Sequence, residues 1–188
     1  YNVEPPPAAK KLRELFYMAH IIHSHAAHFY VLAAPDFVMG PTSDPAQRNV
    51  IGVISKLGRE AGEKIIRHRA YAQHIQAVIG GKATHPVCGL PGGMSKPINE
   101  EERQEFEGMA KNLVEFGRFG LKLFDDVVLA NTEYVDLIKS EAYTMQTYYM
   151  GLVDSNNKVA FYDGTVRVID PAGKEFLRFD PSDYQEHI

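Results

Sequence analysis

The sequence predicts a mainly α protein with a small antiparallel β subdomain (α+β), in which three long packed helices precede a C-terminal β-meander. Along three long segments, apolar residues recur at steps of three and four, the period of a helix that buries one face. Beyond Ala142 the period shortens, and runs of β-branched and aromatic residues alternate with turn residues. We expect a helical bundle over residues 1–142 with a glycine-rich loop at 80–97, and a small antiparallel sheet over residues 143–188, truncated at its end.

The first helix is expected to run from Ala8 to about Ala34. The prolines at 5–7 suit its start, because proline is tolerated in a first turn but not deeper in a helix. Pro35-Asp36 is expected to end it. Its apolar positions are Leu12, Leu15, Phe16, Ala19, Ile22, Ala26, Phe29 and Ala33.

This helix carries four histidines in two pairs, His20 with His23 and His25 with His28. Each pair has the i,i+3 spacing that can share a helix face. At about 100° per residue, however, the two pairs point to different sides of the helix. We therefore expect polar packing or interface hydrogen bonds from these imidazoles, and no metal site formed by this helix alone.

A second helix is expected to begin at Asp44 as N-cap, with Pro45 in its first turn, and to run unbroken to Ile79. At 1.5 Å per residue this helix would be about 50 Å long. Its apolar stripe is Val50, Ile54, Leu57, Ala61, Ile65, His68, Ala72, Ile75 and Ile79. A packed, hydrogen-bonded role is favoured for His68 over that of a buried catalytic base.

Asn99 is expected to cap the third helix, because Glu102 follows at the spacing of a capping box. This helix should reach about Ala130, and Gly120 on its apolar seam would let another helix pass close. A short helix, capped by Thr132, should follow. Short strands are expected at 148–153, 159–162, 165–169 and 175–179, with Asp163-Gly164 and Ala172-Gly173 as the hairpin turns between the last three.

The segment from Gly80 to Gly93 separates the second and third helices. Its five glycines and two prolines in fourteen residues exclude a regular helix. A stiff, glycine-lined turn with one imidazole, His85, and one thiol, Cys88, is typical of a site or interface loop. An ordinary glycine-rich connection is the alternative. We expect Cys88 to be a small buried or half-buried side chain rather than a nucleophile paired with His85.

Composition narrows the function further. With 45% hydrophobic and 23% charged residues and a net charge of −4, the chain lacks the basic surface of a nucleic-acid-binding protein. No apolar run is long enough to span a bilayer. One cysteine excludes an internal disulfide and any Cys-x-x-Cys motif. These features favour a cytoplasmic setting. Because the chain begins at Tyr1 and ends without a clear stop, we expect a piece of a longer protein.

Four stretches occur in an order and at distances that carry a resemblance: Pro5–Leu15, His23–Asp36, Gly80–Pro86 and Pro91–Gly93. Together they resemble the large subunit of nickel–iron hydrogenases, over essentially the whole chain. The residues of these stretches are most similar to those of the soluble cytoplasmic branch of the family. That family binds its nickel–iron centre through two Cys-x-x-Cys motifs, and neither is present here. The resemblance therefore implies an interior fragment with no metal ligand or catalytic residue of its own.

The resemblance also implies an activity and partners. The parent reaction is the reversible oxidation of H2 to protons and electrons. The implied partners are an iron–sulfur small subunit, together with an F420-, NAD(P)- or heterodisulfide-linked subunit. By position, His85 corresponds to a family histidine near the proximal cluster of the small subunit, which implies an electron-transfer interface. The loop residues carried over with it are Gly80, Gly81, Pro86, Pro91, Gly92 and Gly93. Cys88 matches no metal ligand of the family.

Two other interpretations remain open at this stage. One is the quinone-site subunit of respiratory complex I, a relative of the hydrogenase subunit that lacks the cysteine ligands. The motifs His85-Pro86 and Pro91-Gly92-Gly93, however, favour the hydrogenase. A self-standing helical interaction module belongs to a different class, and it predicts a stable monomer without an exposed apolar patch.

Overall fold

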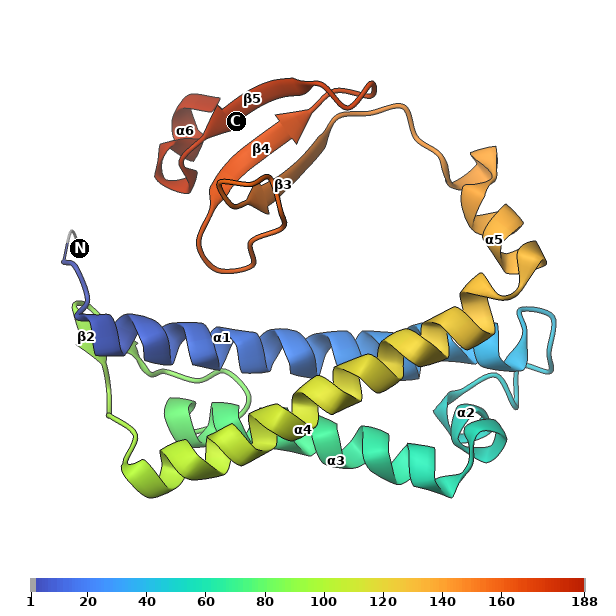
Figure 1. The fold of residues 1–188 in the computed structure, drawn as a ribbon, viewed down its shortest axis with the longest axis horizontal. Coiled ribbons are helices and arrows are strands. Elements are labelled where there is room, and N and C mark those ends of the chain that lie inside the picture. The colour runs from blue at the N-terminus through green and yellow to red at the C-terminus, as the bar shows by residue number, and fades with distance from the viewer. Residues whose placement is uncertain (1–2, 188) are drawn as a thin grey trace. The chain divides into compact units, whose positions relative to one another are not determined.

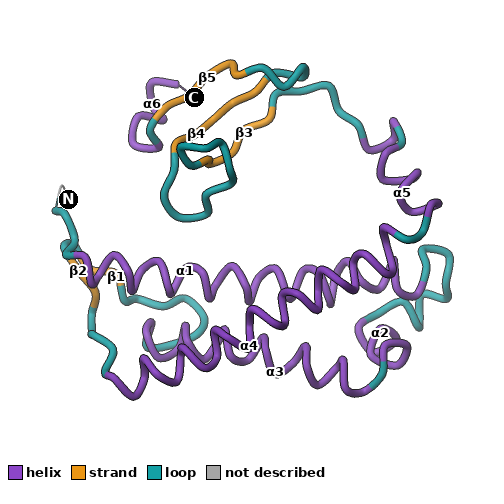
Figure 2. Tube along the Cα trace, viewed as in Figure 1, coloured by secondary structure: helices purple, strands orange, loops and turns teal. Residues whose placement is uncertain are grey.

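The computed structural model describes residues 3–187 of the chain. The chain divides into two compact units, one up to Val135 and the other from Asp136 onward. The first unit is helical and contains a two-stranded hairpin, and the second contains a three-stranded antiparallel sheet (Figures 1 and 2). The expected fold class, mainly α with a small antiparallel sheet, is confirmed.

Three long helices build the first unit, and Figure 1 shows α1 and α3 side by side with α4 crossing them. Helix α3 runs antiparallel to α1, since Gln76 of α3 lies beside His20 of α1 and Gly80 lies beside Phe16. The helical segments are α1 (Pro7–Ala27), η1 (His28–Ala33), η2 (Pro35–Met39), α2 (Val50–Leu57), α3 (Arg59–Gly80), α4 (Glu100–Phe124), η3 (Asp125–Leu129) and α5 (Thr132–Lys139), of which η1, η2 and η3 are π-helical.

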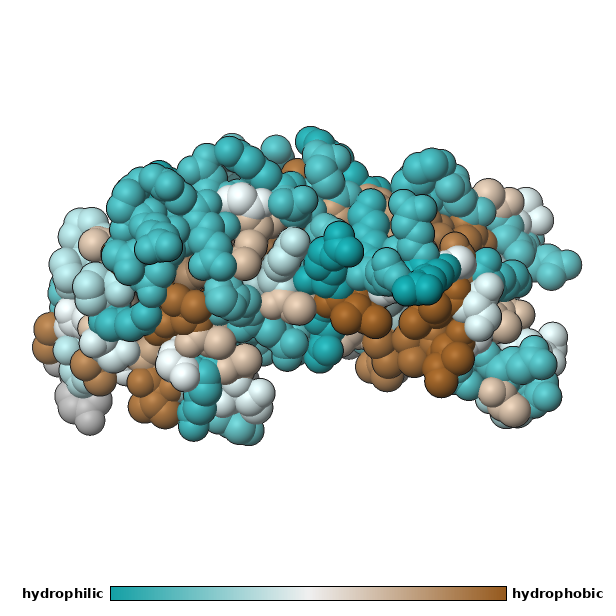
Figure 3. Space-filling model, turned by 90° about the horizontal axis from the view of Figure 1, so that it is seen from below, coloured by the Kyte–Doolittle hydropathy of each residue, from teal (hydrophilic) through white to brown (hydrophobic). Residues whose placement is uncertain are grey.

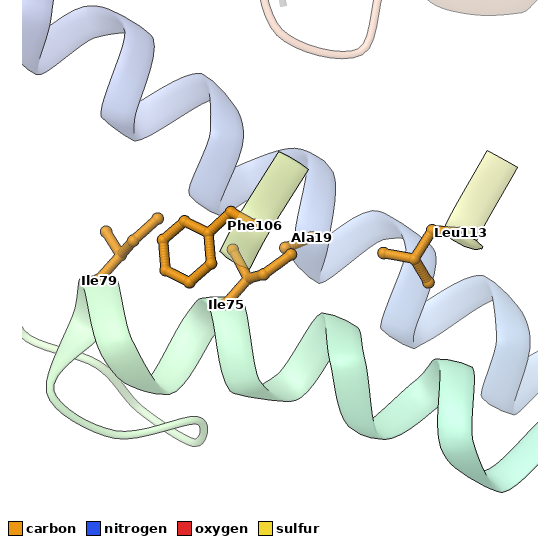
Figure 4. Close-up of a cluster of buried hydrophobic side chains, with 5 residues drawn as sticks. All are labelled: Ala19, Ile75, Ile79, Phe106 and Leu113. Carbon is orange, nitrogen blue, oxygen red and sulfur yellow. The ribbon is translucent and has the colours of Figure 1, made fainter. Parts of the chain in front are cut away.

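The centre of the core is a cluster to which all three long helices contribute. Figure 4 shows Ala19 of α1, Ile75 and Ile79 of α3, and Phe106 and Leu113 of α4 converging on one another. Ile75 and Ile79 are 2% and 1% exposed. Burying a side chain of this size contributes about 1.5–3 kcal/mol, so this cluster holds the three helices together.

A second cluster of buried residues includes Tyr30, Ile65 and Phe116. The ring of His68 stacks on Phe116 with 4.8 Å between ring centroids, and its Nδ1 lies 2.7 Å from the carbonyl oxygen of Lys64. The predicted packed and hydrogen-bonded role of His68 is therefore confirmed.

The expectation of one long second helix was wrong. Helix α2 ends at Leu57, and Gly58, at φ +94°, separates it from α3. The N-cap is Asn49, whose side chain accepts hydrogen bonds from Ile51 N and Gly52 N, and not Asp44, which only closes a turn with Ala46 N. The fully buried residue of α2 is Val53, which is not on the predicted apolar stripe.

The expected end of the first helix at Pro35 was also wrong. The helix widens into the π-helical segment η1 at His28, and a further π-helical segment begins at Pro35 itself. Proline is tolerated there because the first turn of a helical segment does not need its N–H. The helical path ends at Met39, where Gly40 adopts φ +99°.

The predicted capping box of the third long helix is confirmed. Glu102 N donates to Asn99 Oδ1 at 2.8 Å, and Asn99 N donates to Glu102 Oε2 at 2.9 Å. The short helix predicted to follow is α5, but its cap is not Thr132. Asn131 provides the cap, since its side chain accepts from Glu133 N at 3.0 Å.

The second unit contains β3 (Tyr149–Val153), β4 (Thr165–Ile169) and β5 (Glu175–Phe179) in the order β3-β4-β5. The expected strand at 159–162 is absent from the described sheet, because Val159 forms only an isolated bridge. The Asp154 carboxylate accepts from Asn156 N and Lys158 N and closes a turn there. Thus Asp163-Gly164 is not a hairpin turn. The predicted turn before β5 is confirmed, with Gly173 at φ +82°. Short helical turns complete this part of the chain: η4 (Glu141–Tyr143), η5 (Pro181–Asp183) and α6 (Tyr184–His187).

The surface carries several large apolar side chains. Figure 3 shows hydrophobic surface gathered in patches between hydrophilic ones on the face it displays. On the helical unit Ile51, Ile66 and Leu121 are each at least 66% exposed, and Val87 of the glycine-rich loop is 77% exposed. Within residues 3–187, no helix is both long and apolar enough to cross a membrane.

Replacing Asn49 by alanine removes the acceptor for two backbone N–H groups at the start of α2. We expect the free energy of unfolding to fall by about 1 kcal/mol in chemical denaturation. The matched control is Asp44→Ala, which removes a turn hydrogen bond outside any helix and should cost less than about 0.5 kcal/mol. A larger loss for Asp44→Ala would contradict this assignment of the cap.

Gly120 faces the hydroxyl of Tyr30, and a Cβ at position 120 would lie 2.9 Å from that oxygen. The hydroxyl is buried and has no hydrogen-bond partner among the described residues. Tyr30→Phe should therefore leave the unfolding free energy unchanged or raise it by up to about 1 kcal/mol. Gly120→Ala should destabilise the parent chain and become at least about 1 kcal/mol less costly in the Tyr30→Phe background. A double-mutant cycle measures this coupling, and additive effects would contradict the contact.

Candidate functional site

The glycine-rich loop begins where α3 stops. Gly81 ends the helix in the left-handed conformation at φ +78°, which favours glycine. Gly80 is buried, and a Cβ there would lie 2.6 Å from Pro86 Cβ and 3.0 Å from a ring carbon of Phe16. The chain therefore turns back at once and packs Pro86 against the end of its own helix, which only a glycine at position 80 permits.

The far end of the loop is a small hairpin. Strands β1 (Gly89–Leu90) and β2 (Gly93–Met94) pair antiparallel through the two-residue turn Pro91-Gly92 (Figure 2). Gly92 has φ +77°, the sign that a type II turn requires at this position, and proline suits the position before it. The predicted loop residues Pro91, Gly92 and Gly93 thus form one rigid turn.

Arg13 of α1 holds this hairpin in place. Its Nη2 donates to the carbonyl oxygens of Leu90 at 2.8 Å and Gly93 at 2.7 Å, one acceptor on each strand. Sequence reasoning assigned no role to Arg13. Its position three residues before Phe16, on the same face of α1, is the signal that could have indicated an inward orientation.

His85 lies in the loop between the end of α3 and Pro86, the residue that packs back against that helix. Its side chain is exposed, and its backbone adopts φ +50°. Such a left-handed conformation is uncommon for a non-glycine residue, although histidine adopts it more often than most. No hydrogen bond or ion pair involves the imidazole within the part of the chain that the structure describes. The loop therefore presents this side chain outward.

Cys88 is 7% exposed, as expected for a small buried side chain. Its carbonyl oxygen accepts from Ser95 N at 2.8 Å, which closes the base of the hairpin. No hydrogen bond joins its thiol to the exposed His85 across the described residues, so the two do not form a nucleophile–base pair.

An open cavity of about 710 Å³ lies between the loop and the start of α1. It is lined by Val3, Arg13, Phe16, Pro86, Val87, Cys88, Gly89, Leu90, Pro91, Gly92 and Met94. Among the described lining residues Arg13 is the charged one, and most of the others are apolar. The cavity can therefore receive an apolar group that carries an acceptor for the guanidinium.

The four histidines of α1 and η1 lie on two sides of this helical path. His20 Nδ1 lies 3.4 Å from Gln76 Nε2, whereas His25 and His28 line a groove between α1 and α4. Burial first, and then the charges of Arg69 and His20, lower the pKa of His23 below its ordinary value of 6.5. Over residues 3–187, no group of three or more His, Cys, Asp or Glu side chains could hold a metal ion.

No protein-family model matches the chain. Among curated proteins, an F420-non-reducing hydrogenase iron-sulfur subunit from Archaeoglobus profundus is 45% identical over 188 residues, which is all of this chain and 39% of that protein. An F420-non-reducing hydrogenase vhu subunit from Methanocaldococcus jannaschii is also 45% identical over 188 residues, and 44% of its length is covered. The chain thus spans about two fifths of these relatives.

The solved structures that resemble this chain are also hydrogenases. A crystal structure of an NAD+-reducing [NiFe]-hydrogenase in the H2-reduced state matches 97% of this chain and 40% of its own, with a TM-score of 0.86 and 31% identity. The Ni-Fe-Se hydrogenase from D. vulgaris Hildenborough matches at a TM-score of 0.70 and 22% identity, a likeness of fold alone.

The fold and the loop define a class of protein, a helical scaffold that presents a rigid glycine-rich loop. The family follows from the relatives, which match this chain over its full length. The chain belongs to the large subunits of nickel–iron hydrogenases.

The lowered pKa of His23 makes stability depend on pH. Below pH 6.5 His23 binds a proton in the unfolded chain but not yet in the folded chain. The free energy of unfolding therefore falls as the pH drops through the folded-state pKa. We expect this fall, measured by denaturation between about pH 7.5 and pH 5.5, to be smaller in His23→Gln. His28→Gln, at an exposed position on η1, is the control. An equal change in both variants would contradict the assignment to His23.

Proposed function

We propose that this chain is part of the catalytic large subunit of a nickel–iron hydrogenase, which oxidises H2 reversibly to protons and electrons. The observation that carries the proposal is the 45% identity, over all 188 residues, to two proteins named as hydrogenase subunits. The alternatives, a quinone-site relative of complex I or a self-standing interaction module, have no such support. We propose a cytoplasmic setting, in keeping with the composition.

Within that protein, the chain would supply scaffold and an interface for the iron–sulfur small subunit. The geometry of the loop supports this role. It is anchored at Pro86, which packs against the end of α3, and at the hairpin, which Arg13 holds, while His85, directly before Pro86, is exposed. An imidazole held out on a rigid loop can donate a hydrogen bond to a cluster sulfur or order water beside it, and such contacts tune the reduction potential of a cluster.

The nickel–iron centre of the intact protein would be bound by residues outside this stretch. Nickel in this family is held by soft thiolates, and this chain has one cysteine, which is buried in the loop. The residues present therefore do not fit the metal ligand set. What they can do is position the scaffold and present His85.

The electron acceptor is a further proposal. The relatives carry names with different acceptors: the archaeal proteins are called F420-non-reducing, and HoxS subunit beta from Cupriavidus necator, 28% identical over 193 residues, is called NAD-reducing. Of the F420-, NAD(P)- and heterodisulfide-linked subunits expected from the sequence, these names favour a partner that does not reduce F420.

Replacing His85 by asparagine removes the imidazole but keeps a residue that tolerates the left-handed backbone. In the intact enzyme, we expect H2-dependent reduction of the small-subunit clusters, followed by stopped-flow spectroscopy, to slow by about 10-fold, because an outer-shell contact to the cluster is lost. Nickel content, measured by elemental analysis, should be unchanged. The control is Lys82→Gln, an exposed change in the same loop.

Two outcomes would contradict the role proposed for His85. Loss of nickel from His85→Asn would mean that the residue supports the metal centre instead. An unchanged rate of cluster reduction would mean that the loop does not take part in electron transfer.

A further inference from the structure

Arg13 uses only part of its hydrogen-bonding capacity. A guanidinium has five N–H donors, and the two bonds to Leu90 O and Gly93 O both come from Nη2. Nε is buried and donates to nothing within residues 3–187. Leaving such a group without an acceptor is costly, and more so for a charged group.

Arg13 also lacks a counter-ion, because no salt bridge among residues 3–187 involves it. Glu4, the acidic residue next in sequence to Val3 of the cavity lining, is paired with Lys10. The guanidinium charge is therefore not neutralised locally, although the residue is half-buried. A planar guanidinium in this situation is best matched by a carboxylate.

The walls around Arg13 favour the same ligand. Phe16 and Met94 contribute apolar surface, and Val87 and Leu90 at the same cavity are 77% and 47% exposed. An apolar surrounding lowers the local dielectric constant and strengthens an ion pair formed inside it. Exposed apolar side chains beside it would be covered by the same partner that supplies the carboxylate.

We propose that an Asp or Glu side chain of the partner protein enters this cavity and pairs with Arg13. The inference rests on the proposed function, in that it takes the glycine-rich loop as the surface on which the small subunit docks. Arg13 then has two roles: Nη2 fixes the hairpin from one side, and the remaining donors bind the partner from the other. The docked partner would also cover Cys88, which lines the same cavity.

The first experiment replaces Arg13 in the full-length polypeptide and measures, at low and high salt, its affinity for the iron–sulfur subunit. Arg13→Gln should weaken binding about 30-fold and reduce its salt dependence, because a charge that pairs across the interface is lost. Arg13→Lys keeps the charge and should stay within about 5-fold of the parent. Arg67→Gln removes an equal charge from an exposed position on α3 and is the matched control.

The pattern across the variants separates charge recognition from loosening of the hairpin. If Arg13 acted only by holding Leu90 and Gly93, any loss of binding in the variants would not depend on salt, because no charge would pair across the interface. That outcome, or equal weakening in Arg13→Lys and Arg13→Gln, would overturn the proposal.

The second experiment tests the docking surface itself through Cys88. Alkylation by iodoacetamide, followed on the Cys88 peptide by mass spectrometry, should be at least about 10-fold slower in the intact complex than in the separated large subunit, because a docked partner excludes the reagent. Protection of Cys88 with no charge effect at Arg13 would leave the loop as an interface and reject the acidic side chain. Equal alkylation in both states would reject the interface. Complete protection already in the separated large subunit would reject a cavity that is open at Cys88, and with it the docking of a partner side chain there.

Discussion

The antiparallel contact between α1 and α3 is the constraint on which the rest of the helical unit depends. Ala19 is 2% exposed at this contact and packs against Ile75, which is also 2% exposed. A small residue opposite a large one lets the two helices approach closely and fixes their register. With the register fixed, the end of α3 lies beside Phe16, and Arg13, almost one turn earlier on α1, lies within reach of the hairpin. Core packing therefore determines where the loop is held.

Features that depend on neighbours in sequence could be predicted. The capping box of Asn99 and Glu102 needs only residues three apart, and both of its hydrogen bonds are present. His68 was correctly assigned as a packed histidine because its acceptor is the carbonyl of Lys64, one turn earlier on the same helix. The turn at Gly173 likewise follows from local backbone preference. In each case the partner is specified within a few residues.

Features that depend on a choice between two locally allowed conformations could not be predicted. The helical spacing of apolar residues continues unchanged across Gly58, and glycine is tolerated in a helix. The sequence alone therefore favours one continuous helix. In the structure, Ile54 packs where a Cβ of Gly62 would lie, at 2.8 Å, and the chain breaks at Gly58 to allow it. Pro35 shows the opposite case: a residue that usually ends a helix occupies the first turn of a π-helical segment.

Within the candidate site, the same distinction separates His85 from Arg13. The glycines and prolines around His85 mark a loop by composition, whereas the acceptors of Arg13 lie 77 and 80 residues further along the chain. Such a contact follows only from the tertiary register. The left-handed backbone of His85 was equally hidden, because only a small fraction of histidines adopt that conformation, although histidine does so more often than most residues.

The arrangement of Arg13 implies that hairpin rigidity and partner binding are thermodynamically coupled. A guanidinium that is half-buried, bound to two carbonyls and without a carboxylate partner among residues 3–187 is stabilised further by whatever neutralises its charge. Any ligand that binds the ordered hairpin more tightly than the disordered one shifts the loop toward order. The exposed imidazole of His85 lies on the same loop, so ordering the hairpin also restricts where that side chain can lie. A carboxylate at Arg13 would thus help to hold His85 in the position from which we propose that it contacts the small subunit.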